Sequence, residues 1–316
     1  MNTEVKVIDC HYMGQEKLAA AYLLEYGGEL ACVDTNTNDA VPGILDALES
    51  MGRAPDDVRY IVVTHVHLDH AGGCGQLLAA CPNATVLAHP RATRHLVDPS
   101  RLVASARSVY GDAEFNALYG TISGIDESRV QSMDDESTVE LGGHALRFLH
   151  TRGHANHHLV LWDVDGHRVF SGDAFGLTYP LLQGPGPLTF PSSSPTDFDP
   201  ELARQSVRRI KACALERVYP THFGEVADVA LAASQMMRHL DHFEVILNDA
   251  IQSDRPDEEL EAYCAVRMRD YFTGLLNQHG ALGSDPAVWA WLKLDLDLNA
   301  QGIAFVATKA RKVASE

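Results

Sequence analysis

The chain has 316 residues, with 43 acidic against 25 basic side chains, so its formal net charge at pH 7 is −18. Because phosphate binding relies on a surface rich in lysine and arginine, this balance argues against nucleic acid as a partner. The apolar runs are short and none approaches the roughly 20 residues that a membrane-spanning helix requires, so we expect no membrane partner.

The first part of the chain alternates between strand and helix patterns. Residues 5–10, 18–26 and 30–34 predict three strands, with a hairpin turn at Gly27 and Gly28. Residues 39–51 carry apolar side chains at helical spacing, and the β-branched run at 60–63 predicts a buried strand. We then expect a short helix at 75–81, a strand at 85–88, and a mainly helical inserted cap at 91–125.

Directly behind the run at 60–63 lies the segment 64–70, THVHLDH, which packs three imidazoles and a carboxylate into six positions. In a strand-like stretch His65 and His67 share a face because side chains alternate with period two. A turn signalled by Gly72 lets Asp69 and His70 reach a second point a few ångströms away. The segment therefore predicts a metal site that can serve two cations.

Three further ligand-type residues follow apolar runs later in the chain. His154 comes after strand patterns at 139–149, Asp173 follows the strand predicted at 168–171, and His222 follows the run 217–221. Four strand ends that carry His or Asp predict one shared rim. A strand at 159–164 and a helix at 200–215 complete this half, and the Gly, Pro and Ser-rich loop at 183–195 could border the pocket.

From about residue 228 the pattern changes to long helical periodicity, at 230–250 and 258–277. We therefore expect a catalytic domain at 1–227 and a helical C-terminal extension at 228–316. The apolar stripe of this extension could close over its own pocket or pack against a second subunit, and we expect a homodimer through it.

The order of the ligand-type residues over 60–224 resembles that of the metallo-β-lactamase-fold hydrolases: a His-x-His-x-Asp-His loop, a lone His, a lone Asp and a final His. The resemblance implies an α+β fold, the four-layer αβ/βα sandwich. It also implies that one metal is bound by His65, His67 and His154, the other by Asp69, His70 and His222, and that Asp173 bridges the two.

Such a site predicts hydrolysis of a small-molecule substrate. Two divalent cations that share a water lower its pKa toward about 7, so a metal-bridging hydroxide can act as the nucleophile. We expect zinc, with iron or manganese as alternatives, because imidazoles and carboxylates suit all three. Asp69 and Asp173 would orient the hydroxide. Tyr179 is the candidate proton donor, against the alternative of a core tyrosine with its hydroxyl tied down.

Aromatic and apolar residues near the ligands suit a moderately apolar ester, lactone or thioester as substrate; they are Phe175, Tyr179, Leu181, Phe190, Tyr110 and Tyr119. Arg91, Arg94 and Arg152 keep a phosphoester or a glutathione conjugate open. The alternatives are a phosphodiesterase, an iron-dependent oxygenase similar to persulfide dioxygenases, and a signalling protein that retains the metal site.

The remaining histidines are expected to have supporting roles. His150 and His158 would pack beside the ligands, and His157, where many relatives carry Gly, either lines the pocket or bonds a loop carbonyl. The sequence opens without the basic and apolar pattern of a secretory signal, and its six Cys show no paired short spacing. We therefore expect a cytoplasmic location.

Overall fold

The computed structural model describes residues 5–184, 186–280 and 282–315. They form two compact units. The first unit comprises the described residues of Met1–His150, His157–Gly172 and Cys213–Ala227, and the second unit those of Thr151–Asn156, Asp173–Ala212 and Asp228–Glu316. The domain boundary predicted at residue 227 stays a prediction. The compact units divide the chain differently, because residues from Asp228 onward group with 151–156 and 173–212.

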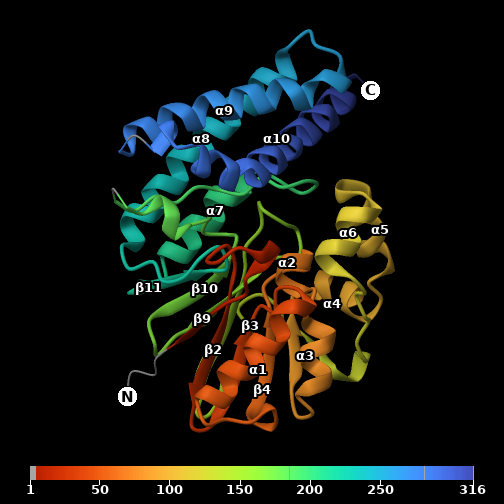
Figure 1. Ribbon diagram of the computed structural model, residues 1–316, viewed down its shortest axis with the longest axis vertical. Coiled ribbons are helices and arrows are strands. Elements are labelled where there is room, and N and C mark those ends of the chain that lie inside the picture. The colour runs from red at the N-terminus through yellow and green to blue at the C-terminus, as the bar shows by residue number, and fades with distance from the viewer. Residues whose placement is uncertain (1–4, 185, 281, 316) are drawn as a thin grey trace. The chain divides into compact units, whose positions relative to one another are not determined.

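The first unit holds two mixed β-sheets (Figure 1). In the six-stranded sheet the order is β1-β2-β3-β4-β5-β6, and the first three strands are antiparallel while β3 to β6 run parallel. Its strands are β1 (Lys6–Asp9), β2 (Ala20–Tyr26), β3 (Glu29–Val33), β4 (Val58–Val63), β5 (Thr85–Ala88) and β6 (Val130–Ser132). The predicted opening hairpin and the buried strand β4 are confirmed, whereas β6 was not predicted.

The second sheet has five strands in the order β11-β10-β9-β8-β7, of which only β10 and β11 pair in parallel. They are β7 (Thr138–Leu141), β8 (His144–His150), β9 (Leu159–Asp163), β10 (Arg168–Gly172) and β11 (Arg217–Pro220). The predicted stretch 139–149 is thus interrupted by a turn at Gly142 and Gly143, both with positive φ. A Cβ on Gly142 would lie 2.0 Å from the carbonyl oxygen of Tyr26, so only glycine fits there.

Alternating side chains give the six-stranded sheet two buried faces. On β2, Leu23 faces the helices α1 and α3, while Tyr22 and Leu24 face residues of the second sheet such as Phe148 and Phe170. The helices of this unit are α1 (Val41–Ser50), α2 (Leu68–Ala71), α3 (Cys74–Ala80), α4 (Pro90–Val97), α5 (Ser100–Tyr110) and α6 (Asp112–Tyr119). The predicted helical insertion at 91–125 is therefore three short helices.

The second unit is mainly helical, with α7 (Pro200–Lys211), α8 (Val229–Gln252), α9 (Leu260–Gln278) and α10 (Pro286–Ser315). The last three pack on one another (Figure 1). Arg204 of α7 pairs with Asp241 of α8 at 2.9 Å, and Arg311 near the end of α10 donates to the Ile251 carbonyl at 3.1 Å. Within the described residues, we find no helix with the length and apolarity needed to cross a bilayer.

The two mixed sheets, their flanking helices and the C-terminal helical region confirm the predicted fold class, an α+β sandwich of the αβ/βα type. The ligand-type residues follow the carboxyl ends of β4, β8, β10 and β11 along the chain.

Candidate metal centre

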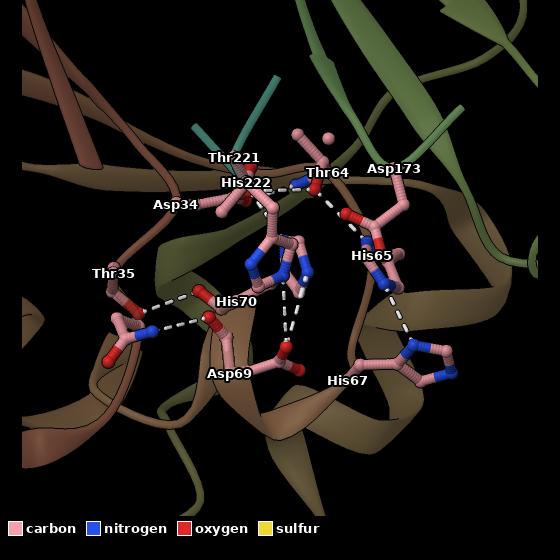
Figure 2. Close-up of polar contacts among 12 residues, drawn as sticks. Asp34, Thr35, Thr64, His65, His67, Asp69, His70, Asp173, Thr221 and His222 are labelled. Carbon is pink, nitrogen blue, oxygen red and sulfur yellow. Dashed lines mark hydrogen bonds and ion pairs between the residues drawn. The ribbon is translucent and has the colours of Figure 1, made fainter. Parts of the chain in front are cut away.

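The motif at 64–70 begins where β4 ends and passes into a single turn of helix. His67 has extended backbone angles at the start of α2, so His65 and His67 precede the helix, and Asp69 and His70 lie within it. The turn predicted at this point is therefore α2. The Nε2 atom of His65 lies 2.9 Å from Nδ1 of His67 (Figure 2), which confirms that these two imidazoles converge.

The second half of the motif meets His222, which follows β11. Asp69, His70 and His222 each offer one ligand atom, and these atoms lie within 4.8 Å of one another. Oδ2 of Asp69 is 3.2 Å from Nε2 of His222 and 3.7 Å from Nε2 of His70. The three side chains point toward one another in Figure 2. Two imidazoles and one carboxylate at this spacing are a donor set that suits a divalent cation.

In each imidazole of this cluster, Nδ1 lies within hydrogen-bonding distance of an oxygen acceptor. Nδ1 of His222 donates to the Leu18 carbonyl at 2.8 Å, and Nδ1 of His70 lies 2.8 Å from Oδ2 of Asp34. Because a carbonyl or carboxylate oxygen accepts, Nδ1 of each ring carries a proton, and Nε2 is the nitrogen that faces Asp69 and would bind a cation. Histidine ligands of metals are oriented in this way, so the residues fit a bound cation.

Asp34 was not predicted as a site residue. It is fully buried, and its carboxylate accepts from the Thr64 amide at 2.9 Å and from the hydroxyl of Thr221 at 2.6 Å, besides contacting His70. It thereby links the ends of β3, β4 and β11. The signal was present in the sequence, because Asp34 directly follows an apolar strand just as the predicted ligands do.

Two neighbours of Asp34 bind the backbone of the motif. The Thr35 hydroxyl donates to the His70 carbonyl at 3.0 Å, and Nδ2 of Asn36 donates to the Asp69 carbonyl at 2.9 Å. The segment after β3 therefore fixes both the side chains and the main chain of the helix that carries Asp69 and His70.

The charge state of Asp69 also suits a ligand. Burial alone would raise the pKa of this carboxyl, but the imidazoles of His70 and His222 outweigh burial and hold the pKa well below its usual range. Asp69 is therefore a carboxylate at neutral pH.

The two remaining predicted ligands lie in the second unit. Nε2 of His154 is 3.5 Å from Oδ2 of Asp173, and Nδ1 of His154 lies 3.2 Å from the Ser192 carbonyl. His154 thus resembles His222: Nδ1 lies beside a backbone carbonyl and Nε2 faces a carboxylate. A small cavity of about 10 Å³, room for roughly one water, is lined by His154 and Asp173 together with Arg152, Ser192 and Met236.

The structure thus brings the predicted ligands together within each unit, as His65 with His67, Asp69 with His70 and His222, and His154 with Asp173. The assembly of all seven around two cations stays a prediction.

The supporting histidines have distinct surroundings in the first unit. The His158 ring stacks on His65 with centroids 4.8 Å apart, and Nε2 of His150 bonds the Met133 carbonyl at 2.9 Å. The ring centroids of His157 and His67 are 5.7 Å apart and His157 is partly exposed, so this imidazole lies beside a predicted ligand.

The residues predicted to line the pocket are mostly buried. Phe175 and Phe190 are completely buried in the second unit, and the hydroxyl of Tyr119 lies 2.8 Å from that of Tyr12 in the first. Leu181 is exposed. The contact of these side chains with a substrate stays a prediction.

The catalytic role of Tyr179 also stays a prediction, and its surroundings favour the structural alternative. The side chain is 1% exposed, its hydroxyl donates to Oδ1 of Asp295 on α10 at 3.1 Å, and its ring meets the ring of Trp291 with centroids 5.9 Å apart.

We expect Tyr179→Phe to lower the free energy of unfolding by about 1 kcal/mol through loss of the Asp295 bond, and to leave turnover nearly unchanged. Denaturant unfolding and steady-state kinetics check this. A fall in kcat by about a hundredfold in a stably folded variant would instead restore the role of proton donor.

Two mixed sheets, together with a His and Asp cluster that could hold a metal ion, define a protein of the αβ/βα class. The family model of the metallo-beta-lactamase superfamily matches residues 16–222. The chain belongs to that superfamily.

Several relatives are similar over part of the chain. The metallo-beta-lactamase fold-containing protein ST1585 of Sulfurisphaera tokodaii is 33% identical over 125 residues, 38% of this chain and 46% of that protein. The beta-lactamase-like protein 2 homolog of Caenorhabditis elegans is 25% identical over 221 residues, 69% of this chain and 60% of that protein. The matches thus span about half the length of these curated relatives. The N-acyl homoserine lactonase AttM of Agrobacterium fabrum is 43% identical over 47 residues, 15% of this chain and 16% of that protein.

Solved structures share the fold. The crystal structure of ST1585 matches with a TM-score of 0.65 and 20% identity, covering 95% of this chain and 97% of that one. A structure of the chemotaxis sensor ODP with a peroxy diiron species matches with a TM-score of 0.51 and 14% identity, covering 69% of this chain and 85% of that one.

Proposed function

We propose that this chain is a dinuclear metal-dependent hydrolase that cleaves a small ester, lactone or thioester. The observation that carries the proposal is the cluster of Asp69, His70 and His222, whose two imidazoles are oriented by the Leu18 carbonyl and by Asp34. A donor set held in advance by buried acceptors is characteristic of a metal site rather than of a chance surface cluster.

The second cation would use His65 and His67, which converge in the first unit. Following the order of the motif, we propose that His154 would add to this pair and that Asp173 would complete the set of residues that hold the two ions. Bound divalent cations supply a Lewis acid for the substrate oxygen and lower the pKa of water. Zinc is the proposed metal, with iron and manganese as alternatives.

The chain's own residues have separate parts in the reaction. Asp69, ionised at neutral pH, accepts a hydrogen bond from the attacking water and so orients it. Asp34 does not touch the reacting atoms but holds the imidazole of His70 in place. We leave Tyr179 out of the proposed reaction because its hydroxyl is bonded to Asp295.

Two observations support an ester-like substrate: the distribution of charge in the sequence and the similarity of a short stretch to a lactonase. Apart from the arginines within residues 90–110, no cluster of lysine and arginine accompanies the motif in the sequence. This disfavours a highly charged phosphate as the reacting group. The short stretch similar to AttM, an N-acyl homoserine lactonase, supports a lactone or a related acyl compound.

Metal analysis by emission spectroscopy, paired with a substrate panel, tests the proposal. We expect about two divalent ions per chain, and hydrolysis of lactones or thioesters that a chelator abolishes and zinc restores. One iron per chain with turnover of glutathione persulfide only under oxygen would contradict it in favour of an oxygenase. Hydrolysis of phosphodiesters alone would indicate a phosphodiesterase, and bound metal without any turnover would indicate a signalling protein.

The cytoplasmic location and a homodimer through the C-terminal helices stay predictions.

A further inference from the structure

The helices α4 and α5 form a basic segment in an acidic chain. Residues 90–110 contain four arginines and a single acid, Asp98, whereas the whole chain has a net charge of −18. In a chain with 43 acidic side chains, this excess of arginine makes a local positive region that can attract an anionic group.

Of these arginines, Arg91, Arg94 and Arg101 form no ion pair among the residues that the structure describes, whereas Arg107 does. Arg107 of α5 pairs with Asp112 at 2.7 Å and also bonds Asn116. By contrast, no ion pair to Arg94 or Arg101 is present in the described part of the chain, and both side chains are exposed. Asp98 is the nearest acid in the sequence, and its Oδ1 accepts a hydrogen bond from the Ser100 amide at 3.0 Å.

His95 joins these cations to the metal motif. Nε of Arg94 donates to Nε2 of His95 at 3.2 Å, and the rings of His95 and His157 are 6.4 Å apart. The His157 ring is in turn 5.7 Å from that of His67. All of these residues belong to the first unit, so a row of imidazoles leads from a predicted metal ligand to an arginine.

The electrostatics at His95 agree with this placement. The pKa of His95 is lowered first by burial and then by the positive charges of Arg94 and Arg101, with Asp98 opposing them. Both guanidinium groups therefore act on the same imidazole, and Arg94, which bonds His95 through Nε, is an exposed residue.

We propose that Arg94 and Arg101 form an anion subsite, and that the substrate carries a carboxylate on the part of the molecule remote from its scissile carbonyl. A guanidinium fork matches a carboxylate and can bind it through two hydrogen bonds. His157 and His95 lie between His67 of the metal motif and the subsite, so an extended chain of several carbons must link the two ends of the substrate. This inference rests on the proposed hydrolase function and narrows its substrate class.

A matched pair of substrates tests the subsite. Para-nitrophenyl octanoate and the mono-para-nitrophenyl ester of suberic acid have acyl chains of the same length, and only the second ends in a carboxylate. We expect the unmodified protein to prefer the suberate ester in kcat/KM, and the double variant R94Q/R101Q to lose about tenfold or more of that preference through KM. Hydrolysis of the octanoate ester should stay within about twofold.

The control is Arg107→Gln. Arg107 lies on α5, as Arg101 does, but its guanidinium already pairs with Asp112, so this variant should keep the preference for the suberate ester. Loss of preference in R94Q/R101Q with an unchanged Arg107→Gln supports the subsite. An equal preference in all three proteins overturns the subsite but leaves the hydrolase proposal standing.

Binding measured without turnover separates the two proposals. Suberate is titrated calorimetrically into the metal-loaded protein and into R94Q/R101Q. Affinity that falls about tenfold in the variant supports the subsite even if neither ester is cleaved, in which case only the hydrolase proposal fails. Equal affinity for suberate in both proteins overturns the subsite.

Discussion

Replacing Asp34 with alanine is expected to lower the free energy of unfolding by about 3–5 kcal/mol, because the buried donors of Thr64, His70 and Thr221 lose their shared acceptor. These donors come from the end of β4, from α2 and from the end of β11, and all three residues are buried. Metal affinity should fall as well, by about 10–100-fold, since His70 loses the group that orients it. Denaturant unfolding and metal titration measure the two effects.

The matched control for this variant is Asp46→Ala. Asp46 is an exposed carboxylate on α1, so its removal should change the free energy of unfolding by no more than about 0.5 kcal/mol. If Asp34→Ala were as stable as the control and bound metal equally well, the role assigned to Asp34 would be wrong.

His222→Ala should have the largest effect on activity. The imidazole is one of three ligand groups in the cluster with Asp69 and His70, and its Nδ1 is already committed to the Leu18 carbonyl. Without Nε2 the cluster keeps two ligands, and we expect loss of one metal per chain together with a fall in kcat of about a thousandfold. Emission spectroscopy and steady-state kinetics provide the measurement.

His144→Ala is the control for that variant, because His144 is a partly exposed histidine of the same unit that pairs with Asp165 at 3.0 Å. It should keep the full metal content and turnover. Full metal content and normal turnover in His222→Ala would mean that the cluster is not the reacting centre.

Much of the fold could be predicted because local patterns determine it. Apolar alternation and β-branched runs placed β2 and β4, and helical spacing placed α1 and α8. The strand pair β7 and β8 was less clear, since two glycines interrupt a run that otherwise looks continuous. The short strand β6 is only three residues long and partly exposed, so it carries little hydrophobic signal.

The ligand-type residues were recognisable because each stands just after an apolar strand, where parallel strands bring their ends together. Asp34 satisfies the same rule but was overlooked, since it lies outside residues 60–224, over which the order of His and Asp residues carried the resemblance. Its contacts join residues 30 and 187 positions apart in the chain, and periodicity carries no information about such distances. The division into compact units depends likewise on long-range contacts of the segment 173–212, which composition does not reveal.

The measurement that tests the metal centre most directly is anomalous diffraction at the zinc edge from crystals of the zinc-loaded protein. We expect two anomalous peaks, one of them about 2.0–2.2 Å from ligand atoms of Asp69, His70 and His222. Zinc bound elsewhere, with no peak beside these three side chains, would contradict it.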